Sequence, residues 1–286
     1  MRKRLLFLVS LMSFLAAVSY GQTTGSFTGR VVDPAGAVVP SATVSVTNTE
    51  KGLSRTTTTN SDGLYTISSL QPGTYDVKVE KPGFASSVRK AVTLLTESTI
   101  TVDFGLTVAS TAEQIEVTTE APLVETTESQ VSGTIQTSEV QNLPMLNRNF
   151  TSLVQLVPGA RPAPILDTSK VNTGAGIAVG GAEGRNLAFN MDGAENKDYL
   201  LGGPAQNISL EGIQEFKLMS HEFGAQYARS GGADLEIATK SGTNSLHGSA
   251  FGFGRNQGMT AIDYFTKQSG LPKNSYDREQ FGGSLG

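Results

Sequence analysis

The sequence predicts a mainly β protein of about two domains, and its patterning carries that prediction. Short segments alternate apolar and polar residues, as in Ala42–Val46 and Tyr75–Val79, which is the period of a half-buried strand. Turn residues such as Asp33–Gly36 separate these segments. The hydrophobic content of 38% falls mostly in this alternation, so a soluble helical bundle is excluded. At roughly 150 residues per domain, the 286 residues allow about two domains.

Composition excludes several functional classes. The formal net charge is −4, and an acidic chain is poorly suited to nucleic acid, whose phosphates require Lys and Arg. Cysteine is absent, which excludes disulfide scaffolds, thiolate metal sites and Cys nucleophiles. His221 has no second His four residues on, and His247 stands alone, so no zinc motif is present. We therefore expect neither an enzyme nor a cofactor.

The N-terminus predicts export. Arg2–Arg4 form a basic segment, and Leu5–Val18 is an apolar run too short to remain as a membrane-spanning helix. Small residues follow, which places the cleavage of a signal peptide between Gly21 and Gln22. Residues 1–21 are therefore predicted to be removed.

Residues 22–107 form the first predicted domain. Six or seven short strands lie between Gly25 and Leu106 and are separated by turns, which indicates an antiparallel β-sandwich. Tyr65 and Tyr75 alternate with apolar neighbours, so we expect them to pack in the core rather than to form a sugar-binding face.

Four blocks of this domain keep a fixed order along the chain: Gly29–Asp33, Pro40–Val44, Asp62–Tyr65 and Leu70–Tyr75. In that order they resemble a carboxypeptidase regulatory-like domain. The resemblance implies a transthyretin-like β-sandwich, a fold often grouped with carbohydrate-binding domains, so carbohydrate is one possible partner. It does not imply peptidase activity.

Residues 108–128 form a predicted linker with one β-prone segment, here called the coupling segment: Glu113, Gln114, Ile115, Glu116, Val117, Thr118 and Thr119. Ala121–Pro122 follows it, and proline cannot donate to a strand ladder. A lone strand between flexible segments suits β-augmentation, in which its backbone pairs with a sheet edge of another protein. The segment resembles the TonB box of outer-membrane transporters, which implies a TonB-type energy transducer as partner. An ordinary linker and the first strand of the next domain are the alternatives.

The second predicted domain spans residues 129–245 and combines short helices with strands. Ser138 is predicted to cap a helical turn that ends at Leu143–Pro144, and Asn147 to cap a second helix. That second helix carries an apolar stripe at the helical spacing: Phe150, Leu153, Val154 and Val157. Strands are predicted at Leu187–Met191, Ile213–Met219 and Ala233–Thr239.

Six blocks of this domain also keep their order: Leu143–Pro144 with Asn147–Asn149, Leu156–Ala160, Gly184–Asn186, Asn190–Ala194, Ile213–Lys217 and Thr239–Asn244. They resemble the α+β plug domain of TonB-dependent receptors of the Oar-like group. The signature positions are Asn190, Asp192, Gly193, Ile213, Glu215, Phe216, Lys240, Ser241 and Gly242. An Oar-like receptor carries a regulatory-like sandwich ahead of its plug, so the domain order supports the resemblance.

Residues 246–286 are predicted to begin an outer-membrane β-barrel. Phe251 and Phe253 share one face of an alternating segment, as lipid-facing residues do, and Gln280–Leu285 starts a second antiparallel strand. Composition leaves a soluble hairpin as the alternative, so the barrel prediction depends on the resemblance. Because a plugged barrel needs about 22 strands, we expect the sequence to be a fragment or a truncated gene product.

Together these features predict the N-terminal portion of a TonB-dependent transporter, located in the cell outer membrane with its N-terminal domain in the periplasm. The resemblance implies plug-gated, energised uptake, a TonB-type transducer as partner, and outer-membrane lipid around the complete barrel. The alternative is an exported carbohydrate-binding or adhesion sandwich without transport activity. The sequence does not identify the substrate, because the barrel loops that would select it are absent from it.

Overall fold

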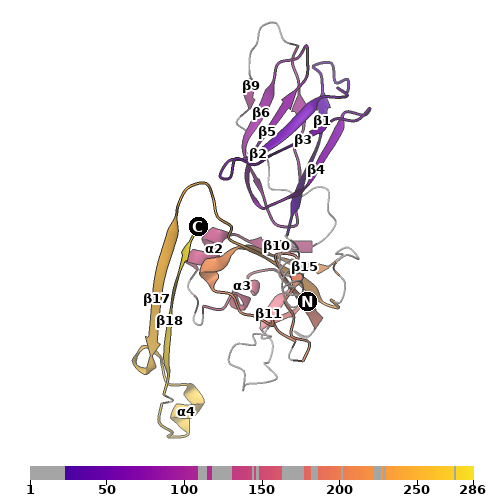
Figure 1. The fold of residues 1–286 in the computed structure, drawn as a ribbon. Coiled ribbons are helices and arrows are strands. Elements are labelled where there is room, and N and C mark those ends of the chain that lie inside the picture. Colours follow the sequence, from indigo (N-terminus) through magenta and orange to yellow (C-terminus); the bar gives the residue numbers. More distant parts are fainter. Residues whose placement is uncertain are drawn as a thin grey trace, which may run out of the picture. The chain divides into compact units, whose positions relative to one another are not determined.

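The computed structural model describes a chain of two units, Met1–Lys240 and Ser241–Gly286 (Figure 1). Described are residues 23–108, 115–117, 131–143, 145, 148–162, 177–181, 186–200, 202–221, 227, 230–273 and 275–286. The predicted signal peptide and its cleavage between Gly21 and Gln22 lie outside these residues and stay predictions. Among the described residues, no helix is long and apolar enough to cross a membrane.

The first domain, here called the sandwich, is built from two sheets (indigo to purple in Figure 1). The central strand of one sheet is β1 (Gly25–Val32). It pairs with β4 (Leu64–Leu70), β7 (Thr99–Thr101) and β8 (Phe104–Gly105). The second sheet has the order β3 (Ser54–Thr58), β2 (Thr43–Asn48), β5 (Gly73–Glu80), β6 (Ser87–Leu94) and β9 (Ile115–Val117). The mainly β fold class is confirmed.

The sequence predicts an antiparallel sandwich, but the sheets of the sandwich contain both parallel and antiparallel strand pairs. β1 runs parallel to β7, with Phe27 opposite Ile100, and parallel to β8, with Val31 opposite Phe104. Alternation of apolar residues predicts where strands lie, but the connection between two strands decides their relative direction. After β6 the chain crosses to the other sheet and enters it in the direction of β1, so those pairs form parallel.

Both tyrosines of the sandwich pack in its core, as predicted. Tyr65 and Tyr75 are 3% and 4% exposed, and the Tyr75 ring meets Phe27 edge to face at 5.6 Å. The Tyr65 hydroxyl donates to the Val102 carbonyl at 2.6 Å, and the Tyr75 hydroxyl to the Gln71 carbonyl at 2.7 Å. Burial raises the pKa of Tyr65, which keeps this donor protonated. Neither ring is available as an exposed platform for a sugar.

The described residues from 131 to 240 form a second region, here called the mixed-sheet domain. Its five strands have the order β10 (Val131–Ile135), β15 (Ile213–His221), β16 (Ala233–Thr239), β13 (Leu187–Met191) and β14 (Ala194–Glu195). β13 and β16 are parallel, and the other pairs are antiparallel. A separate hairpin joins β11 (Ala160–Pro162) to β12 (Ile177–Val179). The three strands predicted in this domain are confirmed, and β15 extends two residues beyond the predicted end, to His221.

The helices of the mixed-sheet domain are shorter than predicted. α2 covers Thr137–Asn142 with Gln136 as its N-cap, so the predicted cap at Ser138 is wrong. The Glu139 carboxylate instead accepts the Gln136 backbone N–H at 3.0 Å and satisfies one free donor of the first turn. The predicted cap Asn147 lies outside the described residues.

The apolar stripe of the second helix is confirmed, although the helix α3 covers only Thr151–Val154. Its four residues are 1–5% exposed: Phe150, Leu153, Val154 and Val157. Beyond α3, the N–H groups of Leu156 and Val157 donate to carbonyls three residues back, so the turns continue in a tighter form. Val157 therefore still reaches the core.

The unit Ser241–Gly286 contains one long hairpin. β17 (Gly248–Asn256) pairs with β18 (Asp277–Leu285) without a register break, and α4 (Tyr264–Gln268) lies in the connection. The predicted second strand is confirmed and begins earlier, at Asp277. The rings of Phe251 and Phe253 lie 5.9 Å apart, as expected for alternate residues of one face.

Candidate functional site

The coupling segment is not the lone strand that the sequence predicts. Ile115–Val117 form β9, which runs parallel to β6 and extends the sandwich sheet. Ser87 lies opposite Ile115, and Arg89 lies opposite Val117. The other four positions of the coupling segment lie outside the described residues: Glu113, Gln114, Thr118 and Thr119. Its role as a TonB box stays a prediction.

The signature residues Asp192 and Gly193 form a tight turn. They join β13 to β14 with φ of 51° and 77°, and Met191 pairs with Ala194 across them. Positive φ at both central residues is the geometry of a type I′ hairpin turn, which Asp-Gly adopts readily. The Asp192 carboxylate accepts the Thr239 N–H at 2.9 Å and the Thr239 hydroxyl at 2.6 Å. The turn is thereby fixed to the end of β16.

The signature residue Asn190 joins two buried carboxyl groups. Its amide Nδ2 donates to Asp234 Oδ1 at 2.9 Å and to Glu236 Oε1 at 2.6 Å. Asn190 lies opposite Glu236 in the sheet register, so both side chains occupy the same face. Asp234 is fully buried and Glu236 is 5% exposed. Asp234 Oδ2 and Glu236 Oε2 have no hydrogen-bond partner within the part of the chain that the structure describes.

Burial makes this pair hold protons. Burial raises the pKa of Asp234 to about 6 and that of Glu236 to about 8. The negative charges of Asp234 and Glu97 raise the pKa of Glu236 further. Lys217, which is fully buried, lies opposite Glu236 on β15. At neutral pH the pair therefore carries at least one proton that an exposed pair would release. Within the described ranges, no three His, Asp or Glu side chains form a metal-binding group.

The sequence analysis missed Asp234 and Glu236. In the sequence of β16, Asp234 and Glu236 alternate with Leu235 and Ile237, and this alternation predicts a strand with one apolar and one solvated face. The structure instead buries both faces of this strand. The one available signal is the acidic pair two residues apart in a strand of a Gly-rich domain, and it does not distinguish a buried face from a solvated one.

A β-bulge brings the signature residues of β15 together. The register between β15 and β16 shifts between Ile213 and Glu215. Because of the extra residue, Ile213 and Phe216, three positions apart, are both fully buried in the core. Glu215 is 5% exposed, and burial raises the pKa of its carboxyl group.

The last signature block is divided between the two units. The Lys240 N–H donates to the Gly212 carbonyl at 2.9 Å and closes the end of β16 against the start of β15. Ser241 and Gly242 belong to the second unit. The structure therefore gathers seven of the nine signature positions in the mixed-sheet domain and leaves Ser241 and Gly242 outside it.

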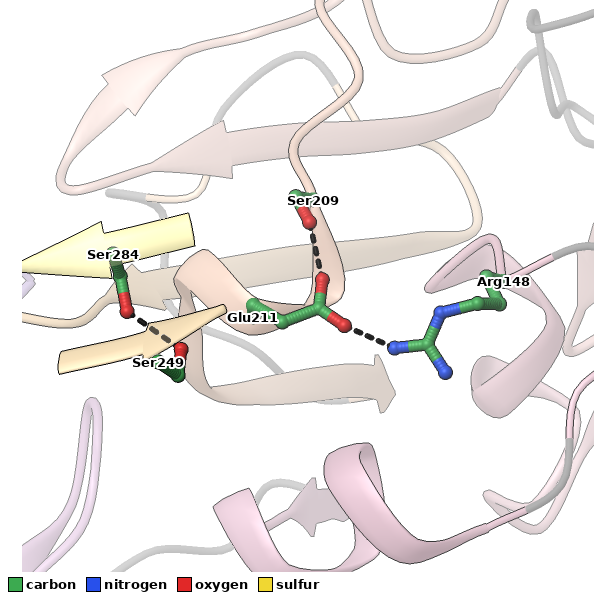
Figure 2. Close-up of polar contacts among 5 residues, drawn as sticks. All are labelled: Arg148, Ser209, Glu211, Ser249 and Ser284. Atoms are coloured by element: carbon green, nitrogen blue, oxygen red, sulfur yellow. Dashed lines mark hydrogen bonds and ion pairs between the residues drawn. The ribbon is translucent and has the colours of Figure 1, made fainter. Parts of the chain in front are cut away.

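An ion pair holds the segment before β15 to the segment before α3 (Figure 2). The Arg148 guanidinium contacts the Glu211 carboxylate, which also accepts a hydrogen bond from the Ser209 hydroxyl. Burial alone would raise the pKa of Glu211, but the hydrogen bond from Ser209 and the Arg148 charge outweigh it and lower the pKa. The Arg148 and Glu211 side chains are only 19% and 15% exposed, so screening by water is limited.

Comparison with known proteins agrees with this architecture. Residues 26–107 match the family model of the carboxypeptidase regulatory-like domain, and residues 238–286 match that of an outer membrane beta barrel domain. The TonB-dependent transporter Oar of Myxococcus xanthus is 26% identical over 250 residues, which are 82% of this chain. The predicted resemblance to Oar-like TonB-dependent transporters is confirmed. The chain spans 22% of the length of that relative.

Two solved receptor structures are also similar. The siderophore receptor PirA of Acinetobacter baumannii is 21% identical, with a TM-score of 0.36, over 44% of this chain and 19% of its own. The ferric enterobactin receptor PfeA of Pseudomonas aeruginosa is 15% identical, with a TM-score of 0.35, over 45% of this chain and 20% of its own. These relatives are transporters or receptors rather than enzymes.

Proposed function

We propose that this chain forms the N-terminal portion of a TonB-dependent outer-membrane transporter, in which a plug gates the energised uptake of a substrate. One observation carries the proposal: similarity to the transporter Oar covers 82% of the chain, which is more than any one of its domains. The match of residues 238–286 to an outer membrane beta barrel domain supports the location in the outer membrane.

In this proposal the coupling segment is the point at which the transducer acts. A TonB-type transducer pairs with the backbone of Glu113–Thr119 by β-augmentation, which needs an extended strand and little side-chain specificity. A pull on that strand is transmitted along the chain to the mixed-sheet domain, which acts as the plug. The signal peptide exports the chain, and the sandwich lies in the periplasm, where the transducer reaches it.

The test is a proline in the coupling segment of the full-length protein. Val117→Pro removes a backbone N–H and prevents ladder pairing, so it lowers binding of the purified periplasmic domain of the transducer at least about tenfold. Val117→Thr is the matched control, because threonine keeps the N–H and favours strands. Transducer binding by Val117→Pro equal to that of Val117→Thr would place the coupling strand elsewhere and overturn this assignment.

We do not adopt the alternative of an exported carbohydrate-binding or adhesion sandwich. The two tyrosines best suited to stack on a sugar are buried, at 3% and 4% exposure. Calorimetry of the exported protein with a panel of glycans tests this choice. Saturable binding to a glycan, lost on truncation of exposed sandwich residues, would restore the alternative.

A further inference from the structure

The two edges of the five-stranded sandwich sheet differ in chemistry. At one edge lies β3 (Ser54–Thr58), whose residues are polar and are exposed at four of the five positions. Its residues resemble those with which natural sheets protect a free edge, since polar and charged side chains discourage further pairing. At the other edge β9 pairs with β6, and the first two residues of β6, Ser87 and Val88, are 5% and 6% exposed.

Burial of Ser87 and Val88 shows that β6 is covered on both faces at this point. Consecutive residues of a strand point to opposite faces, and the strands β2 and β5 of this sheet bury only one of the two. Val88, moreover, is not part of the apolar cluster of the sandwich core. This end of β6 is therefore covered on its outer face as well as on its core face, and the pairing with β9 places β6 inside the sheet order.

β9 is also tethered close to the edge that it covers. The Ala85 N–H donates to the Thr107 carbonyl at 2.8 Å, and Phe84 and Val108 form an isolated bridge. Only residues 109–114 separate this anchor from β9. A tether of that length gives a strand an effective concentration on the order of millimolar at the edge beside it.

We propose that the β6 edge of the sandwich is a docking site for the coupling strand of the same chain, and that the docked strand and the transducer compete. This inference rests on the proposed function. Both partners would use the backbone of Ile115–Val117, and a strand bound to β6 is withdrawn from the transducer in proportion to its docked population. The sandwich thus sets the threshold at which the transducer engages the transporter.

The absence of cysteine from the chain gives a direct test of docking. In the full-length protein, Ser87→Cys with Ile115→Cys places two thiols at opposed positions, and a short reducible bis-thiol reagent bridges them. Thr93→Cys with Ile115→Cys is the control, because exposed Thr93 lies on the same strand but roughly 20 Å farther along. Arg89→Cys with Val117→Cys is a second opposed pair, and its β6 position is partly exposed and therefore open to the reagent.

Docking predicts that the two opposed pairs bridge at least about tenfold faster than the control pair, because pairing holds the opposed positions in register and leaves Thr93 beyond the part of β6 that β9 covers. Equal rates for the opposed and control pairs would overturn docking, whatever the transducer does.

Competition is tested on the bridged protein. The periplasmic domain of the transducer should bind the bridged form of Ser87→Cys/Ile115→Cys at least about tenfold more weakly than the same protein after reduction. Equal or tighter binding by the bridged form would show that β6 presents the strand instead of withholding it, and would overturn competition. If neither the reduced form nor the unmodified protein binds the transducer, the proposed function itself is contradicted. The bridging rates still measure docking in that case.

Discussion

The sandwich and the mixed-sheet domain bury different kinds of polar group. In the described part of the sandwich the buried polar side chains are neutral: Thr23, Asn48, Thr59, Ser87, Thr96 and Ser98. Within the described mixed-sheet domain they include four ionisable ones: Glu215, Lys217, Asp234 and Glu236. Burying a charge is far more costly than burying a hydroxyl, so the mixed-sheet domain has stability that depends on protonation. In the proposed function this domain rearranges during transport, and a domain that rearranges is expected at the less stable end of a structure.

The largest predicted effect breaks the sandwich at Gly29. A Cβ at this position would lie 2.1 Å from the carbonyl oxygen of Val102, which lies between β7 and β8. Gly29→Ala should therefore destabilise the sandwich by more than about 3 kcal/mol, because a backbone atom cannot move aside as a side chain can.

Gly105→Ala is the control, since a Cβ there meets nothing within 4 Å. Urea-dependent proteolysis, with fragments of the two domains resolved by mass spectrometry, measures the sandwich directly. A Gly29→Ala sandwich as stable as that of Gly105→Ala would contradict the close approach of β1 to Val102.

The second effect concerns pH and the mixed-sheet domain. The pKa of Glu236 is raised from 4.5 to about 8, so the folded chain binds this proton more tightly than the unfolded chain. Stability is fully present below the ordinary pKa of Glu and is lost as pH rises toward about 8. Asp234 titrates together with Glu236, and the charges of Glu97 and Lys197 act on this pair. Lys217 faces the pair from β15, opposite Glu236.

Glu236→Gln should reduce that pH dependence, because the amide keeps an acceptor for Asn190 and carries no charge. Between about pH 5 and pH 8 the parent should lose on the order of 2 kcal/mol from this domain, and the variant less than half as much. The control is Glu50→Gln at an exposed position of the sandwich. The same pH slope in parent and Glu236→Gln would mean that the carboxyl group is ionised throughout.

The third effect tests the ion pair of the mixed-sheet domain. Arg148→Gln leaves the Glu211 carboxylate without its cation, which should cost about 1–2 kcal/mol at neutral pH. Since the pKa of Glu211 is lowered, its contribution is present above the ordinary pKa of Glu and is lost as pH falls through the folded value. Arg161→Gln, at an exposed position of β11, is the control in the same proteolysis assay. An identical urea midpoint for both variants at neutral pH would refute the contribution of this pair.

The smallest effect returns to the sandwich. Tyr65→Phe removes the hydroxyl that donates to the Val102 carbonyl and should cost about 1 kcal/mol. Tyr264→Phe, at a side chain that is 69% exposed, should leave stability unchanged. If both variants unfold at the same urea concentration, the buried hydrogen bond contributes nothing net.

Local patterns predicted much of this fold, and the misses have identifiable causes. The stripe of Phe150, Leu153, Val154 and Val157 was predicted from spacing alone, because any helical or tight-turn geometry places these residues on one side. The cap at Ser138 was wrong because several polar residues in a row can cap, and the structure uses Gln136 with Glu139. Alternation also misplaces residues beyond a bulge, as between Ile213 and Phe216.

The candidate site was predicted as residues but not as an arrangement. Asn190, Asp192 and Gly193 were identified from the resemblance, and the Asp-Gly turn follows from its own chemistry. The link from Asn190 to Asp234 and Glu236 needs the parallel pairing of β13 with β16, which joins residues far apart in the sequence. The partner of Ile115–Val117 likewise required the sheet order of the sandwich.

The amino-acid sequence by itself determined the β-rich class, the position of most strands, the export signal as a prediction, and the family that the chain resembles. These depend on the period of side chains and on local turn chemistry, which act over a few residues. Only the tertiary structure decided strand direction, the burial of carboxyl groups and the strand that covers β6. Those depend on contacts between distant segments, because burial and desolvation belong to the assembled sheet rather than to any one strand in it.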